Sequence, residues 1–268
     1  MSSNKPLGII LYEGESLLDG ERIMVIATGV FSNKSENRKV GAMIQTWIMR
    51  RDVPPILAKR LGLDYSICGN CKHRDFDSCY VNLCHGPMHI YNAYHDNRYI
   101  RCSPALSHSS FSNKSIRIGS YGDPAAVPTE IWSGLCFWAK DWTGYTHQWK
   151  NCDQSLKDYC MASVDSKKEY CEAQLMGWRT FRIRQENEAL LTNEFVCLAS
   201  KEGGKKTDCA KCNGCGGLSS KISKSPSIVI HGPNFKVDNF VAGMKKIKNK
   251  KKWRIDFETR YEELKQLA

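Results

Sequence analysis

Short hydrophobic runs recur along the second half of the chain, each followed by a loop and then by a polar or helix-like stretch. Runs of this length are typical of buried strands, and strands that alternate with helices indicate a parallel sheet. We therefore predict an α/β fold, a (βα) barrel or partial barrel, with functional groups at the carboxyl ends of its strands. The predicted strands cover residues 116–121, 143–148, 160–165, 180–184, 195–199 and 227–231.

Two segments between these runs have a helical pattern, residues 128–140 and residues 167–177. The second ends at Gly177, and glycine is the common residue just after a helix. The alternation runs from Ser115 onward and ends after His231. The predicted domains are therefore an N-terminal β extension (1–60), a metal-binding (βα) domain (61–235) and a basic C-terminal tail (236–268).

The first 60 residues have a different pattern. The apolar runs at residues 7–12 and 22–29 predict two strands joined by an acidic turn. Residues 41–51 predict a helix that leads through two prolines into the first group of cysteines. This arrangement indicates an extension that precedes the barrel-like domain.

Composition places the chain among soluble proteins of the cytoplasm. With 268 residues it is long enough for a proper core, and no apolar run approaches the roughly 20 residues that cross a bilayer. Its 39 basic and 28 acidic residues give a net charge of +11, and seven basic residues fall within Lys245–Arg254. This basic segment is either a solvated chain end or a contact to nucleic-acid phosphates. No membrane partner is expected.

The chain contains 13 cysteines, an odd number that fits complete disulfide pairing poorly. Because disulfides are rare in a reducing cytoplasm, so many thiols indicate metal binding or catalysis. Eight of the cysteines form two groups, and we expect the scattered ones to be small buried hydrophobic residues. The groups are Cys68, Cys71, Cys79 and Cys84, and Cys197, Cys209, Cys212 and Cys215.

The first group has the spacing of a metal site. Cys68 and Cys71 are separated by two residues, which turns both sulfurs toward one point, and Cys79 returns after a short loop. Three thiolates leave one iron of a [4Fe–4S] cluster open for catalysis, whereas a fourth would close a structural zinc site. Cys84 is the candidate fourth ligand, and it could equally face the core.

Polar residues near three strand ends are candidates for the chemistry. The segment Tyr121-Gly122-Asp123 ends one predicted strand and places a carboxylate where a ligand amine or hydroxyl can be held. A tight turn capped by Asp123 is the alternative. His147 and Asp165 lie near the ends of the next two strands and would share the same face.

The cysteine loop followed by the strand end at Tyr121, Gly122 and Asp123 resembles the layout of radical SAM enzymes over about residues 60–200. The resemblance implies that Cys68, Cys71 and Cys79 hold a catalytic [4Fe–4S] cluster. It also implies that the three strand-end residues bind the methionine portion of S-adenosylmethionine. Segments such as GSYGDPAAVP, TGYTHQW and MASVDS make the whole chain similar to an uncharacterised family of bacteriophages and prophages.

The second group offers four thiolates, enough for a closed zinc site or an auxiliary [4Fe–4S] cluster. His231, sixteen residues after Cys215, is an alternative fourth ligand. With this histidine the site would resemble the zinc site of tRNA-guanine transglycosylases and their phage relatives, which insert 7-deazaguanines into DNA. That resemblance implies that Asp123 and Asp165 act as nucleophile and acid/base.

Three functions follow as hypotheses. The first is a metal-dependent enzyme, iron–sulfur and radical SAM-like, that modifies a nucleobase or nucleic acid. The second is a zinc-containing transglycosylase-like enzyme. The third is a non-catalytic, metal-stapled nucleic-acid-binding protein, which the positive charge and the aromatic residues Trp142, Tyr145 and Trp149 favour.

Overall fold

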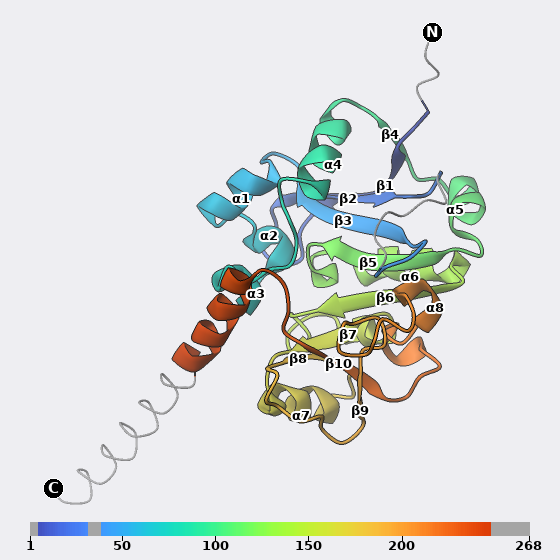
Figure 1. The fold of residues 1–268 in the computed structure, drawn as a ribbon. Coiled ribbons are helices and arrows are strands. Elements are labelled where there is room, and N and C mark those ends of the chain that lie inside the picture. The colour runs from blue at the N-terminus through green and yellow to red at the C-terminus, as the bar shows by residue number, and fades with distance from the viewer. Residues whose placement is uncertain (1–4, 32–38, 248–268) are drawn as a thin grey trace, which may run out of the picture. The chain divides into compact units, whose positions relative to one another are not determined.

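The computed structural model describes residues 5–31 and 39–247, which form two compact units (Figure 1). The first unit holds the described residues up to 71 together with residues 81–229. The second holds residues 72–80 and 230–247. Within this described part of the chain, no helix is both long enough and apolar enough to cross a membrane.

A ten-stranded sheet forms the frame of the first unit, in the order β4-β1-β2-β3-β5-β6-β7-β8-β10-β9. The strands are β1 (Gly8–Glu15), β2 (Arg22–Thr28), β3 (Ile44–Arg50), β4 (Tyr99–Arg101), β5 (Ser115–Tyr121), β6 (Asp141–Thr146), β7 (Met161–Val164), β8 (Thr180–Arg184), β9 (Glu194–Val196) and β10 (Ser225–Val229). β2 is antiparallel to β1 and β3, and all other neighbours are parallel. The predicted α/β class is confirmed. Closure of the sheet into a barrel is not confirmed, because β4 and β9 are the two edge strands of an open sheet.

The N-terminal strands belong to this same sheet and not to a separate extension. Residues 23–27 of β2 are completely buried, as expected for a strand covered on both faces. The helix predicted over residues 41–51 is wrong, because Ile44–Arg50 form β3 between β2 and β5. The β-branched residues Thr46 and Ile48 favour an extended backbone, and pairing on both sides overrides the helix-like pattern.

The rhythm predicted for the second half is confirmed with shifted ends. β5 to β8 and β10 overlap predicted strands, whereas β9 has only three residues. The two predicted helices are α6 (Thr129–Trp138) and α7 (Lys167–Leu175), and Gly177 after α7 has a left-handed φ of 78°. The other helices of this unit are α1 (Pro55–Leu61), α2 (Tyr65–Cys68), α4 (Gly86–His95), α5 (Pro104–Phe111) and α8 (Cys209–Cys212).

One large hydrophobic core fills the first unit between the sheet and its helices. Phe111 and Trp132 are completely buried in it, and so are Cys160 and most of β2. Helices α1, α2 and α4 contact β3, and α7 contacts β7 and β8 (Figure 1). The core thereby fixes the ends of the parallel strands, where the predicted functional residues lie.

The second unit pairs the short helix α3 (Lys72–Asp75) with a helix over residues 234–247. The His73 ring stacks on Phe240, with 5.2 Å between centroids, and its Nδ1 lies 2.8 Å from the Ser78 hydroxyl. A side chain on Gly243 would begin 2.5 Å from the Phe76 ring, so this helix approaches the segment closely. The first part of the predicted basic tail is therefore a packed helix, and residues 248–268 lie outside the described residues.

Candidate functional site at the carboxyl edge of the sheet

The structure brings three predicted residues to one edge of the sheet. Asp123 follows β5, His147 follows β6 and Asp165 follows β7, and these strands are parallel neighbours. Asp123 and Asp165 are buried, at 5% and 4% exposure. The expectation that the strand ends share one face is therefore met, although nothing in this placement assigns a chemical role.

The Asp123 carboxylate joins the ends of β5 and β6. Its Oδ1 accepts hydrogen bonds from the Thr146 hydroxyl (2.7 Å) and from the Ala125 N–H (3.0 Å), and its Oδ2 accepts one from the His147 N–H (2.7 Å). Residues 124–126 form a short 3-10 helix that Asp123 caps, as the capping alternative predicted. Both oxygens are therefore engaged, which suits a positioning residue better than a nucleophile.

Burial also raises the pKa of Asp123, because desolvation penalises the charged carboxylate. The nearby His147 ring and the hydrogen bonds to the carboxylate act in the opposite direction. Two of the scattered cysteines, which we expected to be small buried hydrophobic residues, are influenced by this carboxylate. Burial raises the pKa of Cys152 to about 12 and that of Cys160 well above its usual value, and the Asp123 charge adds to both shifts.

The loop of Cys68 and Cys71 is attached to this same edge. Ile67 O accepts a hydrogen bond from the Asp123 N–H at 2.6 Å. The side chain of Gln148, just after β6, donates to Cys68 O (3.0 Å) and accepts from the Asn70 N–H (3.3 Å). The backbone of the loop that carries Cys68 and Cys71 is thus held beside the ends of β5 and β6, which sequence spacing alone did not reveal.

Two further residues of the predicted cofactor segment have structural reasons for their identity. Gly122 has a φ of 81°, and a Cβ there would lie 2.6 Å from Cβ of Ile48, so glycine is required where β5 approaches β3. Tyr121 is buried at 5% exposure and pairs with Trp47 of β3. At this edge, Tyr121 and Gly122 therefore present backbone groups to a ligand more than side chains.

The remaining predicted ligands, Cys79 and Cys84 of the first group and His231 of the second, belong to different units. Cys84 is exposed in the first unit, in the turn before α4. Cys79 belongs to the second unit, where its carbonyl accepts a hydrogen bond from Lys236 Nζ at 2.5 Å. His231 is also in the second unit, with its ring 5.1 Å from that of Tyr80. The participation of Cys79, Cys84 and His231 in a metal site stays a prediction.

The second cysteine group lies elsewhere, against the first part of β6. Cys197 packs against the small cluster that contains buried Cys209, and α8 carries Cys209 and Cys212 on one turn. Cys215 O accepts a hydrogen bond from the Gly144 N–H at 3.1 Å. None of the thirteen cysteines, all of which are among the described residues, forms a disulfide bond.

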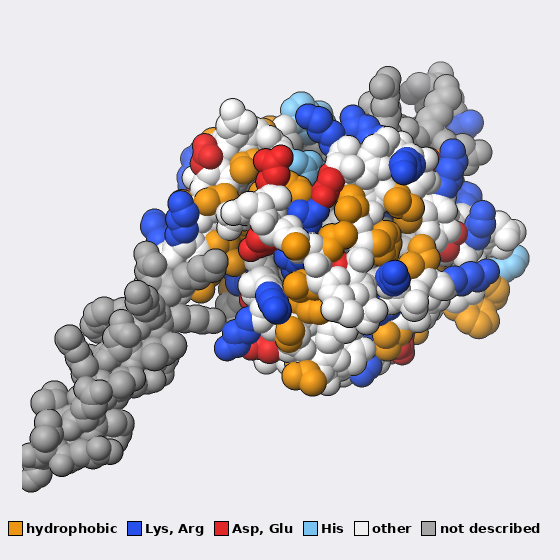
Figure 2. All heavy atoms as spheres, turned by 60° about the horizontal axis from the view of Figure 1, so that its bottom comes forward, with side chains coloured by type: hydrophobic (Ala, Val, Ile, Leu, Met, Phe, Trp, Pro, Cys, Tyr) orange, Lys and Arg blue, Asp and Glu red, His pale blue; other side chains and the backbone are white. Residues whose placement is uncertain are grey.

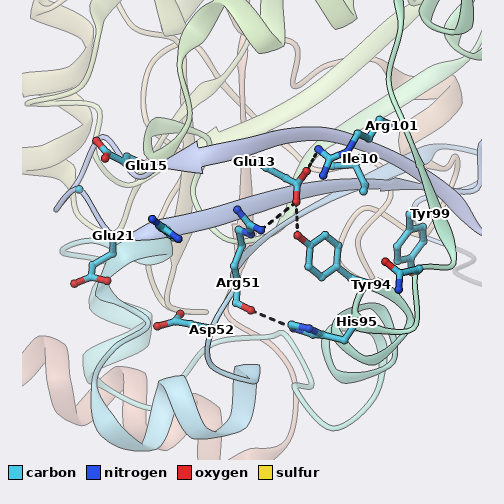
Figure 3. A pocket seen from close by; sticks show the side chains of 13 residues that line it. Ile10, Glu13, Glu15, Glu21, Arg51, Asp52, Tyr94, His95, Tyr99 and Arg101 are labelled. Carbon is cyan, nitrogen blue, oxygen red and sulfur yellow. Dashed lines mark hydrogen bonds and ion pairs between the residues drawn. The ribbon is translucent and has the colours of Figure 1, made fainter.

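A polar pocket that the sequence did not reveal opens beside β1 and α4 (Figure 3). Its volume is about 790 Å³, a size suited to a small organic ligand. Glu13, at 8% side-chain exposure, lies at its centre, where the Tyr94 hydroxyl and Arg101 contact it and Arg51 Nη2 lies 3.5 Å away. The sequence predicted only an acidic turn here. The residues that contact Glu13 come from α4, β4 and the loop after β3, which are distant in the sequence.

Arg50 connects the rim of this pocket with the cysteine loop. The buried guanidinium donates to both oxygens of Asp52, at 2.9 and 2.7 Å, and to Glu21 at 2.8 Å. Its Nη1 donates to the Ser66 hydroxyl at 3.0 Å. Ser66 is followed in the chain by Ile67, whose carbonyl accepts the hydrogen bond from the Asp123 N–H. Arg50 is therefore linked along the carboxyl edge to the cysteine loop and to Asp123.

The basic surface expected for nucleic-acid binding is not concentrated on the face drawn in Figure 2. Lys and Arg side chains are scattered there among hydrophobic and acidic ones. In the basic segment, Lys245 and Lys246 lie in the helix over residues 234–247, and Lys250, Lys251 and Lys252 lie outside the described residues. A nucleic-acid contact therefore stays a prediction.

No protein-family model matches the chain, and neither does any curated protein or solved structure.

Proposed function

We propose that this chain is a metal-dependent enzyme whose reaction centre lies at the carboxyl edge of β3, β5 and β6. The observation that supports it is the attachment of the Cys68–Cys71 loop to Asp123 and Gln148. Thiols, a carboxylate and a histidine are thereby gathered at the edge where parallel α/β sheets place their ligands. In its specific form, the proposed centre is an iron–sulfur cluster used with S-adenosylmethionine on a nucleobase or nucleic acid.

The residues at this edge fit an iron–sulfur cluster better than they fit S-adenosylmethionine. Cys68 and Cys71 are half-buried thiols on a loop fixed by hydrogen bonds, as thiolate ligands of a cluster need to be. Asp123 does not fit a direct contact with the amino group of S-adenosylmethionine, because both oxygens already accept hydrogen bonds. An iron–sulfur centre would supply one-electron chemistry here. Asp123 fixes the backbone of His147, and the imidazole is the candidate proton carrier.

The substrate proposal rests on the neighbouring pocket. It presents carboxylates (Glu13, Glu15, Glu21, Asp52) and cations (Arg22, Arg51, Arg101) around about 790 Å³. Such a mixture of donors and acceptors suits a polar heterocycle, which carries both kinds of group on its edges. The transglycosylase-like alternative is less well supported, since it needs an accessible carboxylate and both Asp123 and Asp165 are buried.

The test is metal analysis of the full chain purified without oxygen, with iron, sulfide and zinc measured per chain. We expect Cys71→Ser to lose the metal of one centre, and Cys171→Ser, an exposed thiol on α7, to keep the wild-type content. The reduced wild type should consume S-adenosylmethionine, and Cys71→Ser should not. His147→Gln should slow this consumption while keeping the metal.

Two results would count against the proposal. Unchanged metal content in Cys71→Ser would contradict a reaction centre at this loop. Zinc without iron in the wild type, together with intact S-adenosylmethionine, would contradict the iron–sulfur form and favour the non-catalytic alternative.

A further inference from the structure

Three aromatic side chains lie in a row on the surface formed by α5 and the end of α6. Phe137 is 76% exposed and Trp138 is 37% exposed, and His108 of α5 is exposed as well. The Trp138 ring meets each of the other two rings nearly edge-on, with 4.8 Å between centroids in both pairs. Single exposed hydrophobic residues are ordinary, whereas rings in contact with one another form a patch that indicates an interaction site.

The way in which α6 packs leaves these rings outside the core. The helix buries Trp132 and Leu135, at 0% and 3% exposure. Because each residue of a helix is rotated by about 100° from the one before, Phe137 projects away from this buried stripe. The Lys140 N–H donates to Lys114 O at 3.0 Å, which fixes the end of α6 beside the segment that follows α5. The two helices also contact each other, so both hold the row of rings in place.

The chain around the rings carries positive charge and no acidic residue. Neither residues 102–122 nor residues 131–140 contain Asp or Glu. Lys140 is exposed, and the half-buried Lys114, to which its backbone is hydrogen-bonded, donates through Nζ to Val30 O at 2.7 Å. A polyanion is therefore attracted by these two segments and meets no carboxylate on them.

The composition of this surface decides which kind of partner fits it. The cores of protein–protein interfaces are depleted in Lys and Ser, which here adjoin the rings in the chain as Lys140 and Ser109. Single-stranded nucleic acid is bound by aromatic rings on which its bases stack, together with cations that follow its phosphates. A duplex keeps its bases stacked on one another, so it cannot use the rings in this way.

We propose that Phe137, Trp138 and His108 form a stacking surface for single-stranded nucleic acid, with Lys140 as a phosphate contact. The surface lies near the amino edge of the sheet, because α6 leads into the start of β6, whereas the proposed reaction centre lies at the carboxyl edge. The inference rests on the proposed function for its choice of nucleic acid as the substrate. The surface would hold a part of the strand that lies away from the reacting nucleotide.

The test is fluorescence anisotropy of labelled oligothymidine with the full chain, compared with a duplex of the same length at the same salt concentration. Phe137→Ala should weaken binding of the single strand about 10-fold, because removal of a stacking ring has effects of this size, and should leave duplex binding unchanged. Phe137→Trp keeps an aromatic face and should bind like the wild type. The control Leu175→Ala removes a hydrophobic side chain from α7 that is 89% exposed, and it should change neither affinity.

Two further variants test another ring and the cation separately. Oligothymidine should quench the tryptophan fluorescence of the wild type, and Trp138→Phe should show less quenching, because Trp138 is the tryptophan in the row. Lys140→Ala should lower the slope of log affinity against log salt by about 0.7, the value for one phosphate contact on a single strand. All of these variants change exposed side chains, so their thermal midpoints should match that of the wild type.

Oligothymidine binding that is unchanged in Phe137→Ala would overturn the proposal. A dimeric wild type and a monomeric Phe137→Ala chain in light scattering, with equal affinities for oligothymidine, would also overturn it, because the patch would then join two copies of the chain. Failure of the proposed function gives a different result. In that case Cys71→Ser keeps its metal, while Phe137→Ala still binds the single strand more weakly than the wild type and supports the stacking surface.

Discussion

At the scale of single residues, Arg50 shows how the carboxyl edge depends on charge. Its side chain is 6% exposed, and Asp52 and Glu21, each 53% exposed, are its counterions. The hydrogen bond from Arg50 holds the pKa of Asp52 below its ordinary value of 3.8. Because Asp52 holds its proton less tightly in the folded protein, its stabilising effect is present above pH 3.8 and fades as the pH falls through the folded pKa.

Replacing Asp52 with Asn should lower the free energy of unfolding by about 0.5–1 kcal/mol at pH 7, a small effect because Asp52 is exposed and Glu21 remains. Denaturant titrations from pH 7 to pH 2 should show the difference from wild type shrinking below about pH 4. Asp96→Asn, an exposed carboxylate outside this network, is the control. A difference that persists undiminished at pH 2 would contradict the ion-pair origin.

At the scale of elements, a buried ion pair fixes the last edge of the sheet. Arg182 of β8 donates through Nε and Nη2 to both oxygens of Glu194 in β9, each at 2.7 Å, and the two side chains are 2% and 0% exposed. Glu194→Gln should cost about 3 kcal/mol in chemical denaturation, because it leaves a buried guanidinium without its main counterion. Adding Arg182→Met should restore much of that loss. A double variant less stable than the single one would contradict this explanation.

The elements also show what the sequence could and could not predict. β5, β7 and β8 are short apolar runs bounded by polar residues, so local pattern was enough to predict them. β3 was mistaken for a helix, because its extended form depends on β2 and β5 and not on its own pattern. The region of α4 and β4 has no strong period, and it supplies one wall of the pocket. The pocket was therefore missed along with these elements.

At the scale of the whole molecule, the candidate sites depend on contacts between distant parts of the chain. Spacing predicted that the second cysteine group would come together, because three of its thiols lie within seven residues. It could not predict Gln148 as the anchor of Cys68, because the two residues are 80 positions apart in the chain. Ligand types follow from local sequence, whereas the residues that tune and fix them follow from the packing of the sheet.

Net charge is a property of the whole molecule too, and it carries the remaining prediction about partners. The +11 charge should give weak binding to nucleic acid whose affinity falls with salt, because cations at phosphates release counterions. If Lys250, Lys251 and Lys252 contact phosphates, replacing all three with Ala should reduce the slope of log affinity against log salt by about 2.7, at about 0.9 per contact. The matched control removes the same charge from the exposed residues Lys167, Lys221 and Lys224. Equal reductions in both triple variants would assign the binding to overall charge, and an unchanged slope in the first would exclude the basic segment as a phosphate contact.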